Sequence, residues 1–161
     1  MRTVLVPIDG SRHGERAVSE ALLRAHREPA EIQLLNVQPR ISSYAACFLD
    51  AESIRAFRED AADRELAGAR DILERAEAPF AVHLHVGEPA RTIAEAARDL
   101  RSAEIVMSAG DSLSFGDVAQ RLLVARVIRL ADVSVVVVKG SVRRAPVLRP
   151  SLGWRRLGYL R

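Results

Sequence analysis

Short apolar segments alternate with longer amphipathic segments along the chain, and this alternation constrains the fold more than any other feature. Apolar and β-branched runs predict five strands, over residues 3–8, 32–37, 80–86, 105–107 and 133–138. Between these runs, apolar residues recur at spacings of three and four, which predicts helices over about 15–25, 50–76, 90–100 and 117–130. Strands separated by helices pair in parallel through right-handed crossovers. We therefore expect an α/β fold of Rossmann-like type, with an open, doubly wound, five-stranded parallel sheet and helices on both faces.

The length and the distribution of apolar residues favour one domain in the cytoplasm. A chain of 161 residues is long enough for one well-packed domain and short for two. No run approaches the roughly 20 apolar residues that cross a bilayer, and the first strand turns polar at Asp9 before a signal-peptide core could form. The single cysteine, Cys47, cannot form an internal disulfide.

Ligands on doubly wound sheets bind beyond the carboxyl ends of the strands. The sequence places polar turns or loops there, over residues 9–11, 37–39, 87–89 and 108–116. In the first of these, Asp9 precedes Gly10 and Ser11, and an Asp-Gly-Ser turn also favours an aspartate that only braces the turn. Both roles of Asp9 remain open at this point.

Four short motifs, in this order and spacing, resemble the universal stress protein family over nearly all of residues 1–139. The motifs are Val-Leu-Val-Pro-Ile-Asp-Gly-Ser at 4–11, Val-Gly-Glu-Pro-Ala at 86–90 with Ile93, Ala-Glu-Ile-Val-Met at 103–107, and the valine-rich segment 133–138. The resemblance implies a stress-response domain over residues 1–140. It also implies, for members that bind ATP, a nucleotide pocket with Asp9 near the ribose and the backbone of Val37 near the adenine.

Members that bind ATP carry a glycine-rich phosphate loop directly after the fourth strand. It consists of a Gly, two residues, a Gly, nine residues, and then Gly-Ser or Gly-Thr. Glycines let backbone N–H groups approach phosphates closely. The resemblance puts Ser108 and Asp111 at the first two glycine positions and Arg121 and Leu122 at the final pair, so all four positions have changed. Gly110 is out of register by one residue.

These changes oppose phosphate binding by charge as well as by shape. Asp111 and Asp117 bring carboxylates toward the expected phosphate position, and Asp117 could itself cap the following helix. Leu122 donates no hydrogen bond, and Arg121 is favoured as a solvated helix residue over a phosphate partner. We expect no ATP cofactor, although a purine-sized cleft could survive.

Other candidate sites have little support in the sequence. His83 and His85 share a face of a predicted strand, but no third ligand accompanies them, so no metal site is expected. His13 lies on or near a charged helix face, and neither Ser11 nor Ser108 has an identifiable base, so no catalytic residue is assigned.

The leading interpretation is therefore a non-enzymatic stress-response protein that does not bind ATP tightly and acts through protein contacts. The rival interpretation is a nucleotide-binding protein or slow ATPase. It would use a re-routed loop around Gly110 and Gly116, with Arg121 as the phosphate partner.

The last predicted strand favours a homodimer. Both of its faces are apolar because four valines follow one another: Val135, Val136, Val137 and Val138. The strand order implied by the resemblance puts this strand at a sheet edge, where unpaired backbone groups promote association. Pairing with the same strand of a second copy would cover the edge. Family dimers commonly form in this way, which implies two-fold symmetry.

The positive charge is concentrated in residues 141–161, which we expect to form a basic C-terminal extension. The formal net charge is +3, but this segment holds six arginines and no acidic residue, which leaves 18 basic against 21 acidic residues in the remainder. Basic residues beside Trp154 and Tyr159 could bind nucleic acid, an anionic membrane surface or an acidic partner. The favoured expectation is an extension that packs on the dimer or stays disordered.

Overall fold

Strands and helices alternate along the chain as the apolar pattern predicts. The computed structural model describes residues 2–40 and 50–139, so the extension expected over 141–161 lies outside the described residues. The elements are β1 (Arg2–Ile8), α1 (Arg12–Arg27), β2 (Ala30–Gln38), α3 (Ala51–Arg75), β3 (Phe80–Val86), α4 (Pro89–Asp99), β4 (Glu104–Ser108), α5 (Phe115–Leu130) and β5 (Ser134–Val138).

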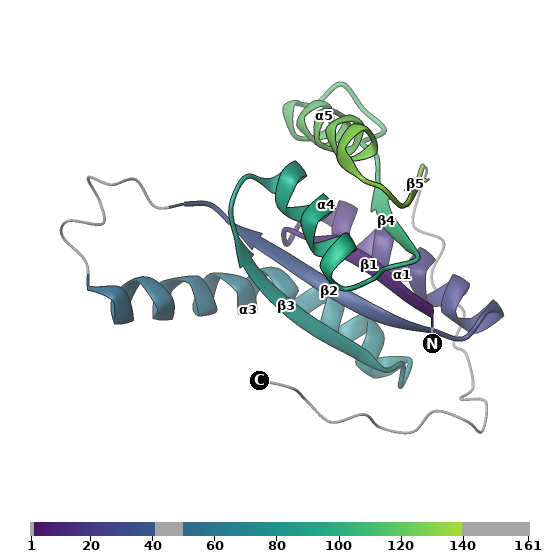
Figure 1. Ribbon diagram of the computed structural model, residues 1–161, viewed down its shortest axis with the longest axis horizontal. Coiled ribbons are helices and arrows are strands. Elements are labelled where there is room, and N and C mark those ends of the chain that lie inside the picture. Colours follow the sequence, from purple (N-terminus) through teal and green to yellow (C-terminus); the bar gives the residue numbers. More distant parts are fainter. Residues whose placement is uncertain (1, 41–49, 140–161) are drawn as a thin grey trace.

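The five strands form one parallel sheet in the order β3-β2-β1-β4-β5, which confirms the predicted fold (Figure 1). The chain moves outward from β1 through β2 to β3, and then returns to the other side of β1 for β4 and β5. The strand order therefore reverses between β1 and β4, and ligands of doubly wound sheets bind at this switch point. β3 and β5 are the two edges of the sheet.

Alternation along the strands divides the core into two layers. Val4, Val6 and Leu34 face one layer, which α1 and α3 cover. Leu5 and Leu35 face the other layer, which α4 and α5 cover. Successive strand residues point to opposite faces, so strands with nearly continuous apolar runs are buried on both sides, as parallel strands require.

Polar side chains cap the helices that begin at the carboxyl edge of the sheet. Ser11 caps α1 by accepting the N–H of His13, and Ser114 caps α5 by accepting the N–H of Asp117. Such side chains satisfy the unpaired N–H groups of a first helical turn. The chain reaches α1 through Gly10, whose φ of +74° suits glycine. Because α1 follows β1 and α5 follows β4, the N-termini of both helices lie at the edge where these strands end.

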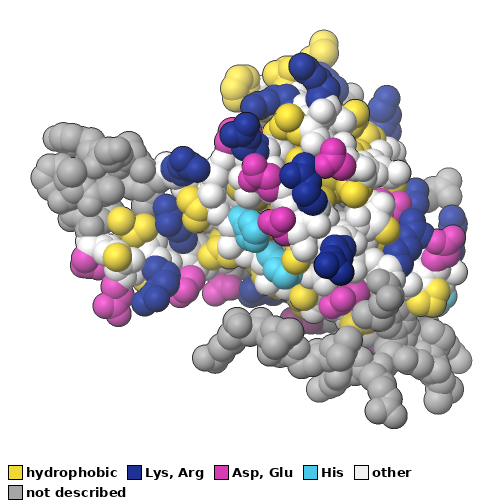
Figure 2. All heavy atoms as spheres, in the orientation of Figure 1, with side chains coloured by type: hydrophobic (Ala, Val, Ile, Leu, Met, Phe, Trp, Pro, Cys, Tyr) yellow, Lys and Arg dark blue, Asp and Glu magenta, His cyan; other side chains and the backbone are white. Residues whose placement is uncertain are grey.

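The inward face of α5 differs from the prediction. We expected Val118, Leu122 and Leu130 to face the core, but they are 37%, 62% and 44% exposed. Val127, which was also expected to face the core, is buried, and Val124 is buried although it was not among the expected residues. The helix is apolar on most of its circumference, so the spacing of its apolar residues does not distinguish the core face from the outer face. Figure 2 shows hydrophobic side chains standing out at the end of the molecule that α5 forms, with basic side chains beside them.

The amphipathic pattern of the helix predicted over 50–76 also fails to identify the buried face in the first half of α3. Phe57, expected to be inward, is 63% exposed. The buried residues of the helix are Ala62, Leu66, Ala69 and Leu73, all in its second half. The first half of α3 extends past the sheet (Figure 1), so its apolar side chains have no strand to cover. No helix among the described residues is long and apolar enough to cross a membrane.

Candidate functional site

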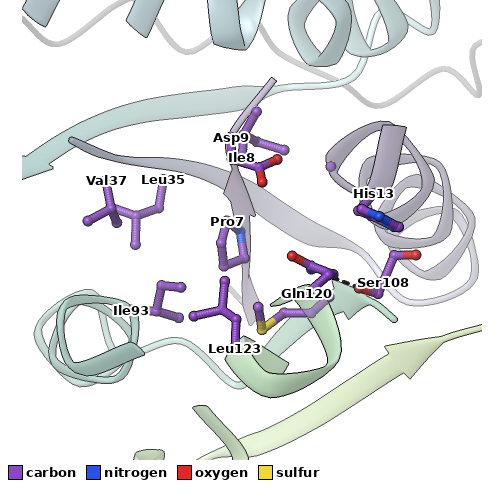
Figure 3. A pocket seen from close by; sticks show the side chains of 12 residues that line it. Pro7, Ile8, Asp9, His13, Leu35, Val37, Ile93, Ser108, Gln120 and Leu123 are labelled. Atoms are coloured by element: carbon purple, nitrogen blue, oxygen red, sulfur yellow. Dashed lines mark hydrogen bonds between the residues drawn. The ribbon is translucent and has the colours of Figure 1, made fainter. Parts of the chain in front are cut away.

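A cleft opens at the switch point, beyond the carboxyl ends of β1 and β4 (Figure 3). The empty space in it is about 430 Å³ when the part that is open to solvent is included. Apolar side chains from β1, β2, α4, β4 and α5 make most of its wall: Pro7, Ile8, Leu35, Val37, Ile93, Met107 and Leu123. The polar lining consists of Asp9, His13, Ser108 and Gln120. Gln120 donates from Nε2 to the backbone oxygen of Ser108 at 2.8 Å, so this side of the cleft is held in place.

A second, polar hollow adjoins the cleft between the N-termini of α1 and α5. It is lined in part by Ser11, Arg12, Ser114 and Asp117. It shares four lining residues with the apolar cleft, namely Asp9, His13, Gln120 and Leu123. The two hollows therefore form the apolar end and the polar end of one groove.

Asp9 lies where the two ends of the groove meet. Its Oδ1 accepts the backbone N–H of Ser11 at 3.0 Å and the Ser11 hydroxyl at 2.6 Å. Asp9 therefore braces the turn, one of the two roles left open by the sequence, and it also lines the groove. Val37 lies at the apolar end, so the structure brings both of these sequence-predicted residues to one site.

Asp117 is buried at the polar end and is surrounded by hydrogen-bond donors. Its side chain is only 2% exposed. Its carboxylate accepts the Ser112 N–H at 2.7 Å and the Ser112 hydroxyl at 2.6 Å. Arg12 Nη2 lies 3.2 Å from Oδ1 and 3.4 Å from Oδ2, and His13 Nε2 lies 3.0 Å from Oδ1. The hydrogen bonds from Ser112, followed by Arg12, hold the pKa of Asp117 well below its usual range.

This cluster corrects two sequence expectations. Asp117 does not cap α5, because Ser114 occupies that position and Asp117 lies in the first turn of the helix. His13, placed by the sequence on or near a charged helix face, is buried with 6% exposure. Its Nε2 atom faces the Asp117 carboxylate at 3.0 Å from Oδ1, so the ring belongs to the cluster.

The free energy of unfolding should depend on pH in acid because of the Asp117 cluster. Because the pKa of Asp117 is lowered in the folded state, its contribution is present above the ordinary carboxyl pKa of about 4 and is lost as the pH falls toward the folded-state value. We expect Asp117→Asn to lower the free energy of unfolding at pH 7 and to make its decline below pH 4 shallower. Urea denaturation between pH 3 and pH 7 measures both effects. Equal slopes for the two proteins below pH 4 would contradict this assignment.

The residues that the resemblance aligns with the phosphate loop contact other parts of the protein. Ser108 ends β4 and lines the apolar cleft. Asp111 contacts Arg16 Nη1 through Oδ2 at 2.7 Å. Gly110 packs directly against the first turn of α5, because a Cβ at this position would collide with Asp117.

Arg121 and Leu122 lie in the second turn of α5 rather than at its N-terminus. Leu122 is on the outer surface. Arg121 Nη1 donates to the backbone oxygens of Gly110 at 3.0 Å and Ser112 at 2.8 Å, so its guanidinium holds the loop. The helix N-terminus at the groove is formed by Ser114 and Asp117, whose Ser-x-x-Asp spacing is the sequence signal of a capping pattern.

The histidines of β3 do not make a metal centre. His83 Nε2 contacts Gln33 Oε1 on the neighbouring strand. Burial lowers the pKa of His83, so the neutral ring is favoured. Within residues 2–40 and 50–139, no three His, Cys, Asp or Glu side chains are placed to hold a metal ion.

The fold and the groove together define a class, the Rossmann-like α/β domains with a groove at the switch point of a five-stranded parallel sheet. Within that class, a model of the universal stress protein family matches residues 1–139. The chain therefore belongs to the universal stress protein family.

Solved structures share the fold over most of the chain. Hypothetical protein MJ0577 has 21% sequence identity and a TM-score of 0.71, with 87% of this chain and 96% of that chain covered. The universal stress protein from Archaeoglobus fulgidus in complex with dAMP has 21% identity and a TM-score of 0.61, with 86% and 98% covered. A family protein from Arabidopsis thaliana with AMP bound has 18% identity and a TM-score of 0.59, with 91% and 96% covered.

Proposed function

We propose that this universal stress protein is a non-enzymatic, cytoplasmic stress-response protein whose groove binds the base and sugar of an adenine-type ligand without binding ATP tightly. One observation carries the proposal. The groove keeps an apolar end and Asp9, while a buried carboxylate, Asp117, occupies the polar end.

The apolar end supports a flat ring as the bound group. Leu35 and Val37 line one wall, and Ile93 and Leu123 line the other (Figure 3). Asp9 stands at the junction with the polar end, where its carboxylate could accept hydrogen bonds from sugar hydroxyls. The AMP and dAMP named for two proteins of similar fold support an adenine-type ligand here.

The polar end gives little support to the ATPase alternative. Asp111 is paired with Arg16. Arg121 would have to leave the carbonyl groups of Gly110 and Ser112 before it could contact a phosphate. His13 lines the groove, but its Nε2 atom lies against the Asp117 carboxylate, so it is not placed as a base for an attacking water.

Titration calorimetry with adenosine tests the binding site. At about 0.3 kcal/mol per non-hydrogen atom, a ligand of this size should bind with a Kd on the order of 0.1 mM. Val37→Trp fills the apolar end and should weaken binding at least tenfold, whereas Val118→Trp makes the same change on α5, outside the groove lining, and should leave the Kd unchanged. Equal binding by both variants would contradict the assignment of the cleft.

We also propose that the protein acts as a homodimer through β5. This strand is an edge of the sheet, and its four valines are only half-buried. Val135 and Val137 contact one core layer, and Val136 and Val138 contact the other, so apolar surface lies on both sides of an unpaired backbone edge. Ile128 of the adjacent α5 is 51% exposed and would add apolar area to such an interface. These features favour pairing with a second copy.

A further inference from the structure

The polar end of the groove has the chemistry of an anion site, but the anion in it belongs to the protein. Two helix N-termini meet there, and N-termini favour negative charge. Arg12 and His13 add a cation and an N–H donor. We propose that Asp117 substitutes for a ligand phosphate, so that the groove selects nucleosides over nucleotides. This inference rests on the proposed function, namely that the groove binds an adenine-type ligand.

The donors that would hold a phosphate are already engaged by Asp117. Its carboxylate accepts two hydrogen bonds from Ser112, at 2.7 and 2.6 Å. Arg12 and His13 complete the set at 3.2 and 3.0 Å. A phosphate entering this end would have to displace the carboxylate from these donors, and a buried charge that loses its partners is costly.

The surrounding charges also oppose a phosphate. The other arginines near this end have acceptors: Arg16 contacts Asp111, and Arg121 contacts the backbone oxygens of Gly110 and Ser112. Asp9 lines both parts of the groove and adds negative charge. A nucleoside is uncharged, and its hydroxyl groups can donate to Asp9, whereas a fully ionised phosphate only accepts.

Packing keeps the Asp117 carboxylate in place. The residue is nearly inaccessible, and the backbone of Gly110 lies so close that even a Cβ on Gly110 would collide with it. The N–H of Asp117 is tied to the Ser114 hydroxyl at 3.2 Å. The carboxylate therefore cannot swing out of the groove when a ligand arrives unless the loop and the first turn of α5 also move.

Calorimetric titration with adenosine, AMP and ATP tests the selectivity. We expect the wild-type protein to bind adenosine at least tenfold more tightly than AMP or ATP. Asp117→Asn removes the competing charge and leaves Arg12 available, so AMP should bind at least tenfold more tightly than to wild type, while the Kd of adenosine changes less than threefold. The control is Asp132→Asn, which breaks the exposed ion pair of Asp132 with Arg98, away from the groove lining, and should behave as wild type.

A second experiment, with inorganic pyrophosphate, tests the inference about Asp117 independently of the proposed function. A thermal shift with pyrophosphate should appear in Asp117→Asn and be absent in the wild type, whether or not adenosine binds. If Asp117→Asn shows this shift but neither protein binds adenosine, the proposed function is rejected. The inference that the Asp117 carboxylate occupies an anion site then still stands. Wild-type protein that binds AMP as tightly as adenosine, or an Asp117→Asn protein with an unchanged preference and no pyrophosphate shift, would overturn the inference. Asp117→Ser is the second variant if Asp117→Asn fails to fold.

Discussion

Replacing Gly110 with alanine is expected to destabilise the protein by about 3 kcal/mol, at the upper end of the usual cost of overpacking. A Cβ at this position would lie 2.6 Å from the backbone oxygen of Asp117 and closer still to its Cα. These are atoms of a helix backbone, which cannot move aside as a flexible side chain can. The loop or the first turn of α5 must therefore shift, and the hydrogen bonds of the Asp117 cluster would be strained.

Gly116 provides the matched control, because it lies in the same helix start and a Cβ there would meet nothing within 4 Å. Gly116→Ala should leave the free energy of unfolding within about 1 kcal/mol of wild type, since alanine is the better helix former. Urea denaturation measures both variants. If Gly110→Ala were as stable as Gly116→Ala, this result would contradict the close packing of Gly110 against Asp117.

A lysine in the edge strand β5 is expected to convert a dimer into a monomer. Val136 lies in the middle of the four valines, and charged side chains on an edge strand prevent pairing with another copy. If β5 pairs with β5, two-fold symmetry would bring the new charges of both copies to the same interface. Sedimentation velocity should give the wild type twice the chain mass of 17.7 kDa, and Val136→Lys a single chain mass.

The control for this variant is Val82→Lys on the opposite edge strand, β3. Val82 is half-buried and contacts the same core layer as Val136, so both changes should cost similar stability. Only Val136→Lys should change the mass. A monomeric wild type, or a Val136→Lys protein that remains dimeric, would contradict the proposed interface.

Most of the fold could be predicted because strand and helix periods differ and the strands of a parallel sheet are buried on both sides. The runs around Val4–Ile8 and 105–107 are too short and too apolar for surface helices, and the helices between the strands allow only parallel pairing. The inward face of α5 could not be predicted, because Val118 and Leu122 on one face compete with Val124 and Val127 on the other. Periodicity identifies a face only when the opposite face is polar.

The sequence predicts the apolar end of the candidate site and Asp9, but it does not predict the ion pair at the polar end. Asp9 and Val37 follow from the rule that ligands meet the carboxyl ends of strands. Arg12 and Asp117 are 105 residues apart in the sequence, and only the folded chain brings them together. Their spacing in the sequence carries no signal of an ion pair.

We infer above all that the groove of this universal stress protein does not hold the phosphates of ATP. Calorimetric titration of the purified protein with ATP and Mg²⁺, after confirming that no nucleotide has co-purified, tests it directly. We expect a Kd weaker than about 1 mM, corresponding to no more than about 4 kcal/mol of binding free energy. Micromolar binding of ATP would contradict the account, because it would require Arg12, Ser112 and the α5 N-terminus to bind phosphate in place of Asp117.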